Sequence, residues 1–364
     1  MNHYPSNVKE KLNSIILSMA EHHWLFSKNP GHDFTRQHLG KLSFYDTMRL
    51  IISMGKGRTN DEIMDYFDLD PDLIPSQSAF CQRRRQISLS AFEYLFSEFS
   101  SSFPSTTDKF KDHCILACDG CHVVYATNSD IIEDYNKPRL IDYKGYNHMH
   151  LNGFVDVISK AFLDVVIQPR QQPDEREALH SMLDHFTPDD PQKYIITADR
   201  GYESYDLLFH CELKNLGYVF RVKSPSSPKS ILSYYASELP DDLEEFDVTI
   251  KRFFTDKATN IMKSQSDVYR YINPSKNTPH FYELLRKKHS HLYFLQFRVV
   301  KIKTAENTQE IYSRLILYNF GIFIANEAAE KNRKKKRDTP YAQIIDSILI
   351  YGNFSSGLLD KSFL

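Results

Sequence analysis

The pattern of apolar and polar positions changes once along the chain, near residue 105. Before that point the apolar residues recur every three or four positions, a spacing that places them on one face of a helix. Two such sets are Leu12, Ile15, Ile16 and Met19, and Phe44, Met48, Ile51 and Ile52. A capping-box pattern at Thr59 to Glu62 predicts the start of a further helix. Residues 1–105 are therefore predicted to form a helical domain.

After a Ser-, Thr- and Pro-containing linker the pattern becomes that of strands. Short apolar, β-prone runs occupy residues 115–120, 123–125, 149–158, 161–167, 194–198 and 218–223. Apolar residues at helical spacing fill 174–186, and Ser204 is placed to cap one more helix. Three strands followed by helix, strand, helix and strand predict a mixed α/β sheet with helices packed on it, over residues 106–223.

Two of these strands close on a carboxylate. The run Ile115 to Ala117 leads through Cys118 to Asp119, and the run Tyr194 to Ala198 leads to Asp199. Sheets of this class place their chemistry at the carboxyl ends of the strands, so the two acids are expected to meet at neighbouring strand ends. Either aspartate taken singly is also a suitable residue for capping a turn.

Composition is that of an ordinary globular protein with 364 residues, of which 41% are hydrophobic and 25% charged. The formal net charge is −2, so contact with nucleic acid must come from local basic patches. No apolar run approaches the ~20 residues of a membrane helix, and the first residues lack the pattern of a signal peptide. These features predict a cytoplasmic protein with no membrane partner.

Five cysteines make an odd count inside apolar segments, which is typical of reduced core cysteines. Cys114 and Cys118 lie four residues apart on a predicted strand. A strand rises ~3.3 Å per residue, so these two thiols are too far apart to share a zinc ion. The sequence predicts neither disulfides nor a cysteine zinc site.

Basic residues gather on one short predicted helix of the first domain. Gln82, Arg83, Arg84 and Arg85 follow a turn at Pro75 and Ser76. Short helices joined by turns, the later one bearing arginines, are typical of a helix-turn-helix module, in which these side chains would reach phosphates or guanine edges. A solvated basic helix face is the alternative interpretation.

Several motifs, in order, resemble bacterial insertion-sequence transposases of the DDE class, in the family numbered four. They are residues 50–55 with 65–67, Ala117 to Gly120, Asn152 with Gly153, Ala198 to Tyr202, and residues 311–320. The resemblance extends from residue 36 to about residue 330.

The resemblance implies a ribonuclease-H-like core in which two Asp and one Glu hold two Mg²⁺ or Mn²⁺ ions. Asp119 and Asp199 match the two aspartates. It also implies double-stranded DNA as partner, both the element ends and the target, with the protein acting as a homodimer on DNA and associated with the bacterial nucleoid. Paired metal ions suit DNA cleavage and transfer, an in-line displacement at phosphorus.

The third acid is where the chain departs from the family. Residues 224–303 resemble its β-rich insertion in truncated form, and residues 304–330 resemble the core's C-terminal helix. The helix with the family's Tyr, Arg, Glu and Lys signature is missing between them. Glu310 is the nearest acid, but it completes a capping box with Asn307, so no third catalytic residue is assigned. Residues 331–364 form a tail that begins with the basic run 331–337.

Three functional interpretations follow. The first is a transposase, expected to be a degenerate copy because its site is incomplete. The second is a non-catalytic remnant that still binds DNA or joins intact transposase subunits. The third is a plain ribonuclease-H-like nuclease, which would not need the N-terminal helices. The missing glutamate helix separates the first from the second.

Overall fold

The computed structural model describes residues 4–35, 42–55, 57–102, 110, 112–137, 145–257, 259–273 and 278–302. The chain divides into two compact units. One consists of Met1–Tyr235 and Phe253–Phe294, and the other of Ala236–Arg252 and Leu295–Leu364. None of the helices in these described ranges combines the length and apolar character that a membrane span requires.

The N-terminal part of the first unit is helical, as its apolar spacing predicts. It contains α1 (Tyr4–Glu21), the 3-10 helix η1 (His23–Leu25), α2 (Phe44–Ser53), α3 (Thr59–Tyr66), α4 (Gln77–Gln86) and α5 (Leu89–Ser101). Ile16, Met19 and Met48 are buried in one cluster, where α1, α2 and α5 pack together. Ile63 and Phe80 fill a second cluster, which holds α3 and α4 against α2.

The predicted helix start at Thr59 is confirmed, but the capping box that predicted it does not form. The N-cap of α3 is Arg58, whose side chain makes no capping hydrogen bond, so Thr59 is the first helical residue. The buried Glu62 carboxylate instead accepts a hydrogen bond from the Gly57 backbone N–H at 2.7 Å. Because the Glu62 side chain bonds to the loop before the helix, it does not pair with Thr59 in a capping box.

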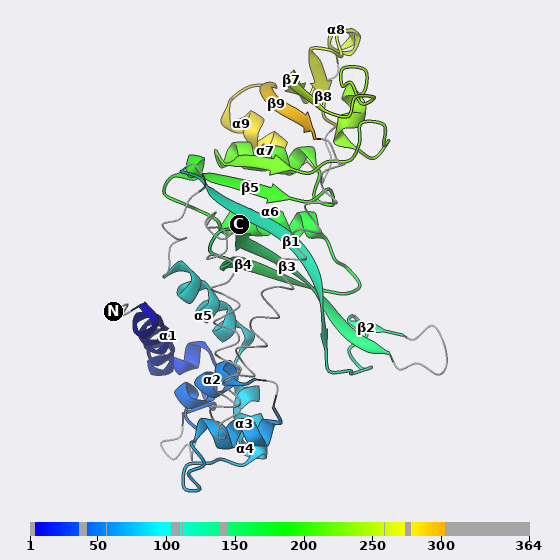
Figure 1. Ribbon diagram of the computed structural model, residues 1–364. Helices are drawn as coiled ribbons and strands as arrows, with labels where there is room; N and C mark the ends of the chain where they lie inside the picture. Colours follow the sequence, from blue (N-terminus) through cyan, green and yellow to red (C-terminus); the bar gives the residue numbers. More distant parts are fainter. Residues whose placement is uncertain are drawn as a thin grey trace, which may run out of the picture. The chain divides into compact units, whose positions relative to one another are not determined.

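A mixed six-stranded sheet forms the centre of the first unit (Figure 1). Its strands are β1 (Cys114–Tyr125), β2 (Tyr135–Asn136), β3 (Tyr146–Asp156), β4 (Phe162–Pro169), β5 (Tyr194–Ala198) and β6 (Gly217–Phe220). The order is β2-β3-β1-β5-β6, and β4 pairs with β3. The β1–β3, β2–β3 and β3–β4 pairs are antiparallel, while β1–β5 and β5–β6 are parallel. This ribonuclease-H-like arrangement confirms the predicted fold class.

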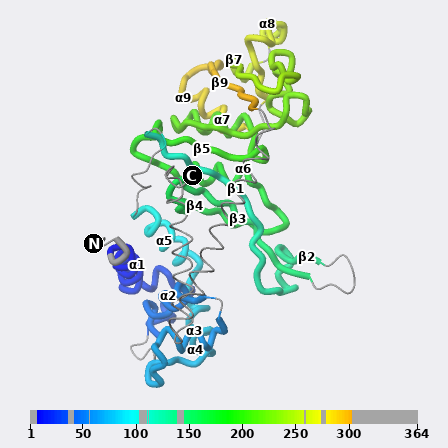
Figure 2. The backbone as a smooth tube through the Cα atoms, in the orientation of Figure 1, coloured from blue at the N-terminus to red at the C-terminus, as the bar shows by residue number. Residues whose placement is uncertain are grey.

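Strand β1 is longer than the sequence pattern predicts. Residues 115–120 and 123–125 belong to one strand of 12 residues, and Asp119 lies within it rather than at its end. The cause is a difference between the two neighbours of β1. β5 pairs in parallel only as far as Cys118, whereas β3 pairs with β1 from Leu116 to Tyr125. The chain therefore stays extended after Asp119, and β1 continues past β5 towards β2 (Figures 1 and 2).

Helix α6 (Glu175–His185) covers this sheet with its apolar face. Ala178, Leu179, Met182 and Leu183, the residues predicted to share that face, are all buried against Leu116, Phe154 and Ile196. Asp174 caps the helix by accepting hydrogen bonds from the N–H groups of Arg176 and Glu177. Ser204 caps α7 (Tyr205–Leu213) as predicted, and α7 packs against α6.

The segment after β6 contains helices as well as strands. It forms the 3-10 helix η3 (Ile231–Tyr235), β7 (Phe246–Thr255), α8 (Asn260–Ser264), β8 (Tyr269–Tyr271), α9 (Pro279–Lys287) and β9 (Leu292–Lys301). A three-stranded sheet has the order β8-β7-β9. The strands β7 and β9 lie in the segment that was expected to be rich in strands, and helix α9 lies beside α7 (Figure 2). The expected segments 304–330 and 331–364 lie outside the described residues.

Packing of α6 on the sheet yields a stability prediction. Leu183 is fully buried, so Leu183→Ala removes apolar contacts and leaves a cavity. We expect the free energy of unfolding to fall by about 2–5 kcal/mol. Leu89→Ala is the control, because the Leu89 side chain is 71% exposed and should change that energy by less than about 0.5 kcal/mol. Urea denaturation of both variants measures the difference, and equal effects would contradict the described packing of α6.

Candidate active site

Asp119 and Asp199 lie side by side on neighbouring strands. Cys118 pairs with Ala198 in the parallel register of β1 and β5, so the next residue on each strand is one of the two aspartates. Paired strands lie ~4.8 Å apart, which sets the backbone separation at this position. Both aspartates are exposed. The fold thus brings together the two acids that the sequence singles out.

Each aspartate accepts a hydrogen bond from a glycine that follows it. The Gly120 N–H donates to Oδ1 of Asp119 at 2.8 Å, and the Gly201 N–H donates to Oδ1 of Asp199 at 2.7 Å. The backbone therefore holds one oxygen of each carboxylate. These contacts are also what a turn-capping aspartate makes, so they orient the carboxylates without deciding their role.

A third carboxylate, that of Glu175 in the first turn of α6, lies near Asp199. A methyl group at Gly201 would lie 2.9 Å from Oε2 of Glu175 and 2.9 Å from Oδ1 of Asp199. These two oxygens are therefore at most twice that distance apart. A methyl group at Gly120 would lie 2.9 Å from Oε1 of Glu175, so this carboxylate spans the space above both glycines. Any side chain at either position would displace it.

Glu175 was not among the residues predicted from the sequence. An acid in the first turn of a helix is common because it interacts favourably with the helix dipole, so its residue type and position carry no functional signal. Only the direction in which α6 starts, relative to β1 and β5, brings it to Asp199. The one sequence feature that could have drawn attention to Glu175 is the adjacent pair of acids, Asp174 and Glu175, at the start of a helix that follows a β-meander.

A chain of hydrogen bonds beneath the carboxylates fixes the start of α6. The Tyr202 hydroxyl donates to Oδ1 of Asn152 at 3.4 Å, and the Asn152 amide donates to Oε1 of Gln168 at 3.2 Å. The same Gln168 oxygen accepts from the Asp174 N–H at 3.0 Å, and its amide donates to the Asp174 carbonyl at 3.0 Å. The residue before Glu175 is thus bonded to β4, and through Asn152 to the loop after Asp199.

The loop that carries Asp199 is anchored by an ion pair between a buried glutamate and a partly exposed lysine. Glu203 has a 1% exposed side chain, and its Oε1 lies 3.3 Å from Nζ of Lys223. Its other oxygen accepts from the Lys223 backbone N–H at 2.5 Å, and Nζ also donates to the Arg200 carbonyl at 3.2 Å. A buried charge paired and hydrogen-bonded in this way stays in one position. It fixes the loop between Asp199 and α7.

The side chains under the site are apolar or neutral. Burial raises the pKa of the Cys118 thiol to about 12 and raises the pKa of the fully buried Tyr202 hydroxyl, and the charges of Asp119 and Glu175 add to both shifts. On the other side, Nε2 of the buried His150 lies 3.3 Å from Oε1 of Glu175. The Cys118 and Tyr202 side chains packed next to these acids are thus uncharged, and one imidazole lies beside Glu175.

These groups have the donor chemistry of a site for a hard divalent cation. Mg²⁺ and Mn²⁺ prefer carboxylate oxygens and retain several waters, so a few converging acids on an exposed edge suit them. Asp119, Asp199 and Glu175 are such acids. Glu310, the other acid considered from the sequence, lies outside the described residues.

The predicted DNA-binding residues lie on α4, and their side chains differ in environment. Gln82, Arg84 and Arg85 are exposed. Arg83 is half-buried, lies over the Phe34 ring with its guanidinium carbon 5.1 Å from the centroid, and donates to Gln86 at 3.0 Å. Residues 67–76 separate α3 from α4. This connection is longer than the roughly three- or four-residue turn of a helix-turn-helix.

Comparison with known proteins gives one family. A family model described as a transposase DDE domain matches residues 110–314, which is more than half of the chain. The match begins just before β1 and includes Asp119, Glu175 and Asp199. No curated protein matches the chain.

The negative charges of Asp199 and Glu175 lie close together, and their repulsion gives a test of the site. Asp199→Asn removes one charge and keeps an oxygen that accepts from the Gly201 N–H. Like charges ~4 Å apart repel by about 1 kcal/mol in water, so the metal-free variant should be as stable as the parent or more stable by up to about that amount. Thermal unfolding in EDTA measures the change. A clear loss of stability would identify Asp199 as a structural cap instead.

Proposed function

This chain belongs to the DDE transposase family, and we propose that it is the transposase of a bacterial insertion sequence, of the family numbered four. It binds the terminal inverted repeats of its element, as a homodimer associated with the nucleoid, and cleaves and transfers DNA strands. The carboxylates of Asp119 and Asp199 hold the divalent ion, Mg²⁺ or Mn²⁺. The observation that carries the proposal is the adjacency of these two acids in the β1–β5 register, within the region that matches the family.

Glu175 supplies the third negative charge of this site in our proposal. Its support is the distance of 2.9 Å that separates both Glu175 Oε2 and Asp199 Oδ1 from the Cβ position of Gly201. Bound divalent ions would activate the attacking oxygen and stabilise the leaving oxygen at phosphorus. The protein's own contribution is to hold the carboxylates. The Gly120 and Gly201 N–H groups orient the two aspartates, and the hydrogen bonds of Asp174 fix the helix start that bears Glu175.

Catalysis by this copy is expected to be weak. The family's helix with the Tyr, Arg, Glu and Lys signature has no counterpart in the sequence between residues 303 and 304. Its loss removes side chains that grip phosphate as well as an acid, and Glu175 replaces only the charge. A site whose positioning groups are missing loses rate even when its ions are bound. The second candidate, a remnant that binds DNA without cutting it, is favoured by this same absence.

Metal binding and cleavage by a matched set of variants test the proposal. Asp119→Asn, Asp199→Asn and Glu175→Gln should each weaken Mn²⁺ binding by about tenfold or more, as loss of a ligand or its support does. Glu177→Gln is the control, because Glu177 is an exposed acid in the same turn of α6 and should have no effect. Titration calorimetry measures binding. Cleavage of a DNA end with the element's inverted repeat, in Mg²⁺ or Mn²⁺, measures activity.

The outcomes separate the candidates. Slow cleavage that all three substitutions abolish supports the transposase with Glu175 at its site. Binding of the DNA end with no cleavage by the parent supports the remnant. Cleavage abolished by Glu310→Ala and unaffected by Glu175→Gln would show that Glu310 is the third acid and that Glu175 is not. Equal cleavage of DNA without inverted repeats would support the plain nuclease.

DNA binding through α4 has its own prediction. We propose that Arg83, Arg84 and Arg85 support binding to phosphates, with Gln82 beside them. Replacing the three arginines with Ala should weaken binding and lower the slope of log K against log salt by about one unit for each phosphate that is no longer bound. Arg84→Ala with Arg85→Ala should cause most of the change. Arg83→Ala should also lower stability, because it removes the interactions with Phe34 and Gln86.

Lys9→Ala with Lys11→Ala is the matched control, since both lysines are exposed on α1 and the same number of charges is removed as in the Arg84 and Arg85 pair. Fluorescence anisotropy at several salt concentrations gives the slopes. An unchanged slope in the arginine variants, or an equal fall in the lysine control, would place the DNA-binding surface elsewhere.

A further inference from the structure

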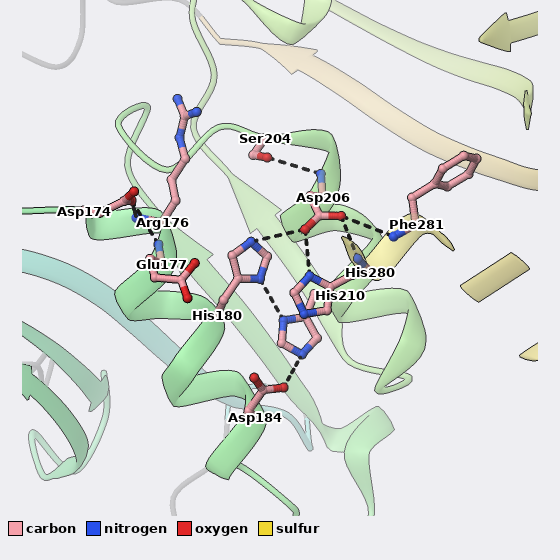
Figure 3. Close-up of polar contacts among 10 residues, drawn as sticks. All are labelled: Asp174, Arg176, Glu177, His180, Asp184, Ser204, Asp206, His210, His280 and Phe281. Atoms are coloured by element: carbon pink, nitrogen blue, oxygen red, sulfur yellow. Dashed lines mark hydrogen bonds and ion pairs between the residues drawn. The ribbon is translucent and has the colours of Figure 1, made fainter. Parts of the chain in front are cut away.

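Three histidines from three helices gather away from the carboxylate site. His180 lies on α6, His210 on α7 and His280 in the first turn of α9, and Figure 3 shows their rings converging. Their side chains are 12%, 2% and 15% exposed. One ring nitrogen from each lies within 4.8 Å of the others. Among the residues that the structure describes, this is the group of three side chains that meets the spacing of a metal site.

Each of these histidines also has a carboxylate partner. The Asp206 Oδ2 atom lies 2.7 Å from Nδ1 of His280 and 3.6 Å from Nε2 of His180. The Asp184 Oδ1 atom lies 3.2 Å from Nε2 of His210 (Figure 3). Asp206 is itself buried, and its Oδ1 accepts from the backbone N–H groups of His280 and Phe281. In metal sites, ligating histidines characteristically donate their second N–H to a carboxylate in this way.

One hydrogen bond between the histidines marks the place for a cation. The Nδ1 atoms of His180 and His210 are hydrogen-bonded at 2.9 Å, so in the metal-free protein one of them carries the proton and the other accepts it. Nε2 of His210 lies 3.2 Å from Asp184, whereas Nε2 of His180 lies 3.6 Å from Asp206, beyond hydrogen-bond distance. A divalent cation would replace the shared proton and bind both nitrogens.

We propose that His180, His210 and His280 bind one divalent cation of the borderline class, Zn²⁺ or its analogue Co²⁺, with Asp206 and Asp184 orienting the rings. Zn–N bonds of ~2.0–2.1 Å place two nitrogens of a tetrahedral centre about 3.4 Å apart. The Nδ1 atoms of His180 and His210 are already closer than that. The rings of His210 and His280 are stacked with centroids 3.9 Å apart, so they rotate until their planes converge on the ion.

The nitrogen donors separate this site from that of Asp119 and Asp199, because imidazole favours Zn²⁺ over Mg²⁺ and carboxylate oxygen has the opposite preference.

The site would join elements that are far apart in sequence. α9 belongs to the segment between β8 and β9, whereas α6 and α7 pack on the central sheet. A cation held by one histidine from each would link the three helices within the first unit. Its role would be structural, since the histidines are largely buried.

The experiment uses the full chain with the metal alone as probe. Metal-free protein receives ZnCl₂ at about 100 times the dissociation constant, and thermal unfolding is recorded. We expect Tm to rise by roughly 5 °C. Co²⁺ should bind one ion per chain at this site with the visible absorption of a nitrogen-rich site. Cobalt–thiolate bands in the near ultraviolet would instead show that cysteines bind the metal, and would overturn the proposal.

Matched variants locate the metal. His210→Gln and His280→Gln should abolish both the Tm shift and the Co²⁺ absorption. His185→Gln is the control, because His185 is on α6, is 69% exposed and contacts Asp164 instead. Asp199→Asn tests the carboxylate site. The zinc response must persist in both of these variants. Its persistence in the His280 variant, its loss in Asp199→Asn, or its absence in the parent would each overturn the proposal.

His210 is buried, so its replacement can prevent folding. The partly exposed His280 then provides the decisive variant, with circular dichroism of the metal-free protein as the check on folding. A folded His280→Gln protein that no longer responds to Zn²⁺ supports the site. Failure of this proposal leaves the transposase function untouched, because the two tests use different residues and different metals.

Discussion

The end of the parallel pairing between β1 and β5 is the constraint on which the candidate active site depends. β5 stops at Ala198, opposite Cys118, while β3 continues to pair with β1 beyond that point. Among the described residues, Asp119 therefore pairs with β3 but not with β5, and Asp199 begins the loop that follows β5. An acid one residue earlier on β1 would point into the core under α6, since side chains alternate between the faces of a strand.

Buried neutral groups keep the acids in place against their mutual repulsion. Tyr202 is fully buried, and its ring packs in the cluster under α6. Through Asn152 and Gln168 its hydrogen bonds extend to the backbone of Asp174. A single hydrogen bond contributes only about 1 kcal/mol, but an unpaired buried polar group costs more, so these side chains have one favourable arrangement. Because Asp174 belongs to this arrangement, the position of the next residue, Glu175, is fixed as well.

Local pattern was sufficient for β5 and for placing the two aspartates on neighbouring strands, but it divided β1 into two runs and did not predict β2 or β8. A run of three β-prone residues before an Asp predicts a strand that leads to an acid. The parallel pairing of β1 and β5 then makes the two aspartates neighbours. The sequence pattern failed where a residue's position depends on contacts with segments far away in the chain. Asp119 lies within a strand because β3 extends it. Glu175 lies near Asp199 because the hydrogen bonds between Gln168 and Asp174 fix the start of its helix. The histidine cluster was missed for a related reason. His180 and Asp184, and Asp206 and His210, each lie four residues apart on a helix, but only the packing of α6, α7 and α9 unites them.

Helix α6 carries residues of both proposed sites, so its packing on the sheet affects the geometry of each site. Glu175 lies in its first turn and His180 about one turn later, and between them Ala178 and Leu179 are buried on the sheet. A rigid helix transmits a displacement along its axis, so a cation that fixed His180 would restrict the freedom of Glu175 as well. The two donor sets remain chemically independent, since carboxylate oxygens select hard cations and imidazoles select borderline ones. Coupling between them would therefore be mechanical, through the position of α6, and would require no shared ligand.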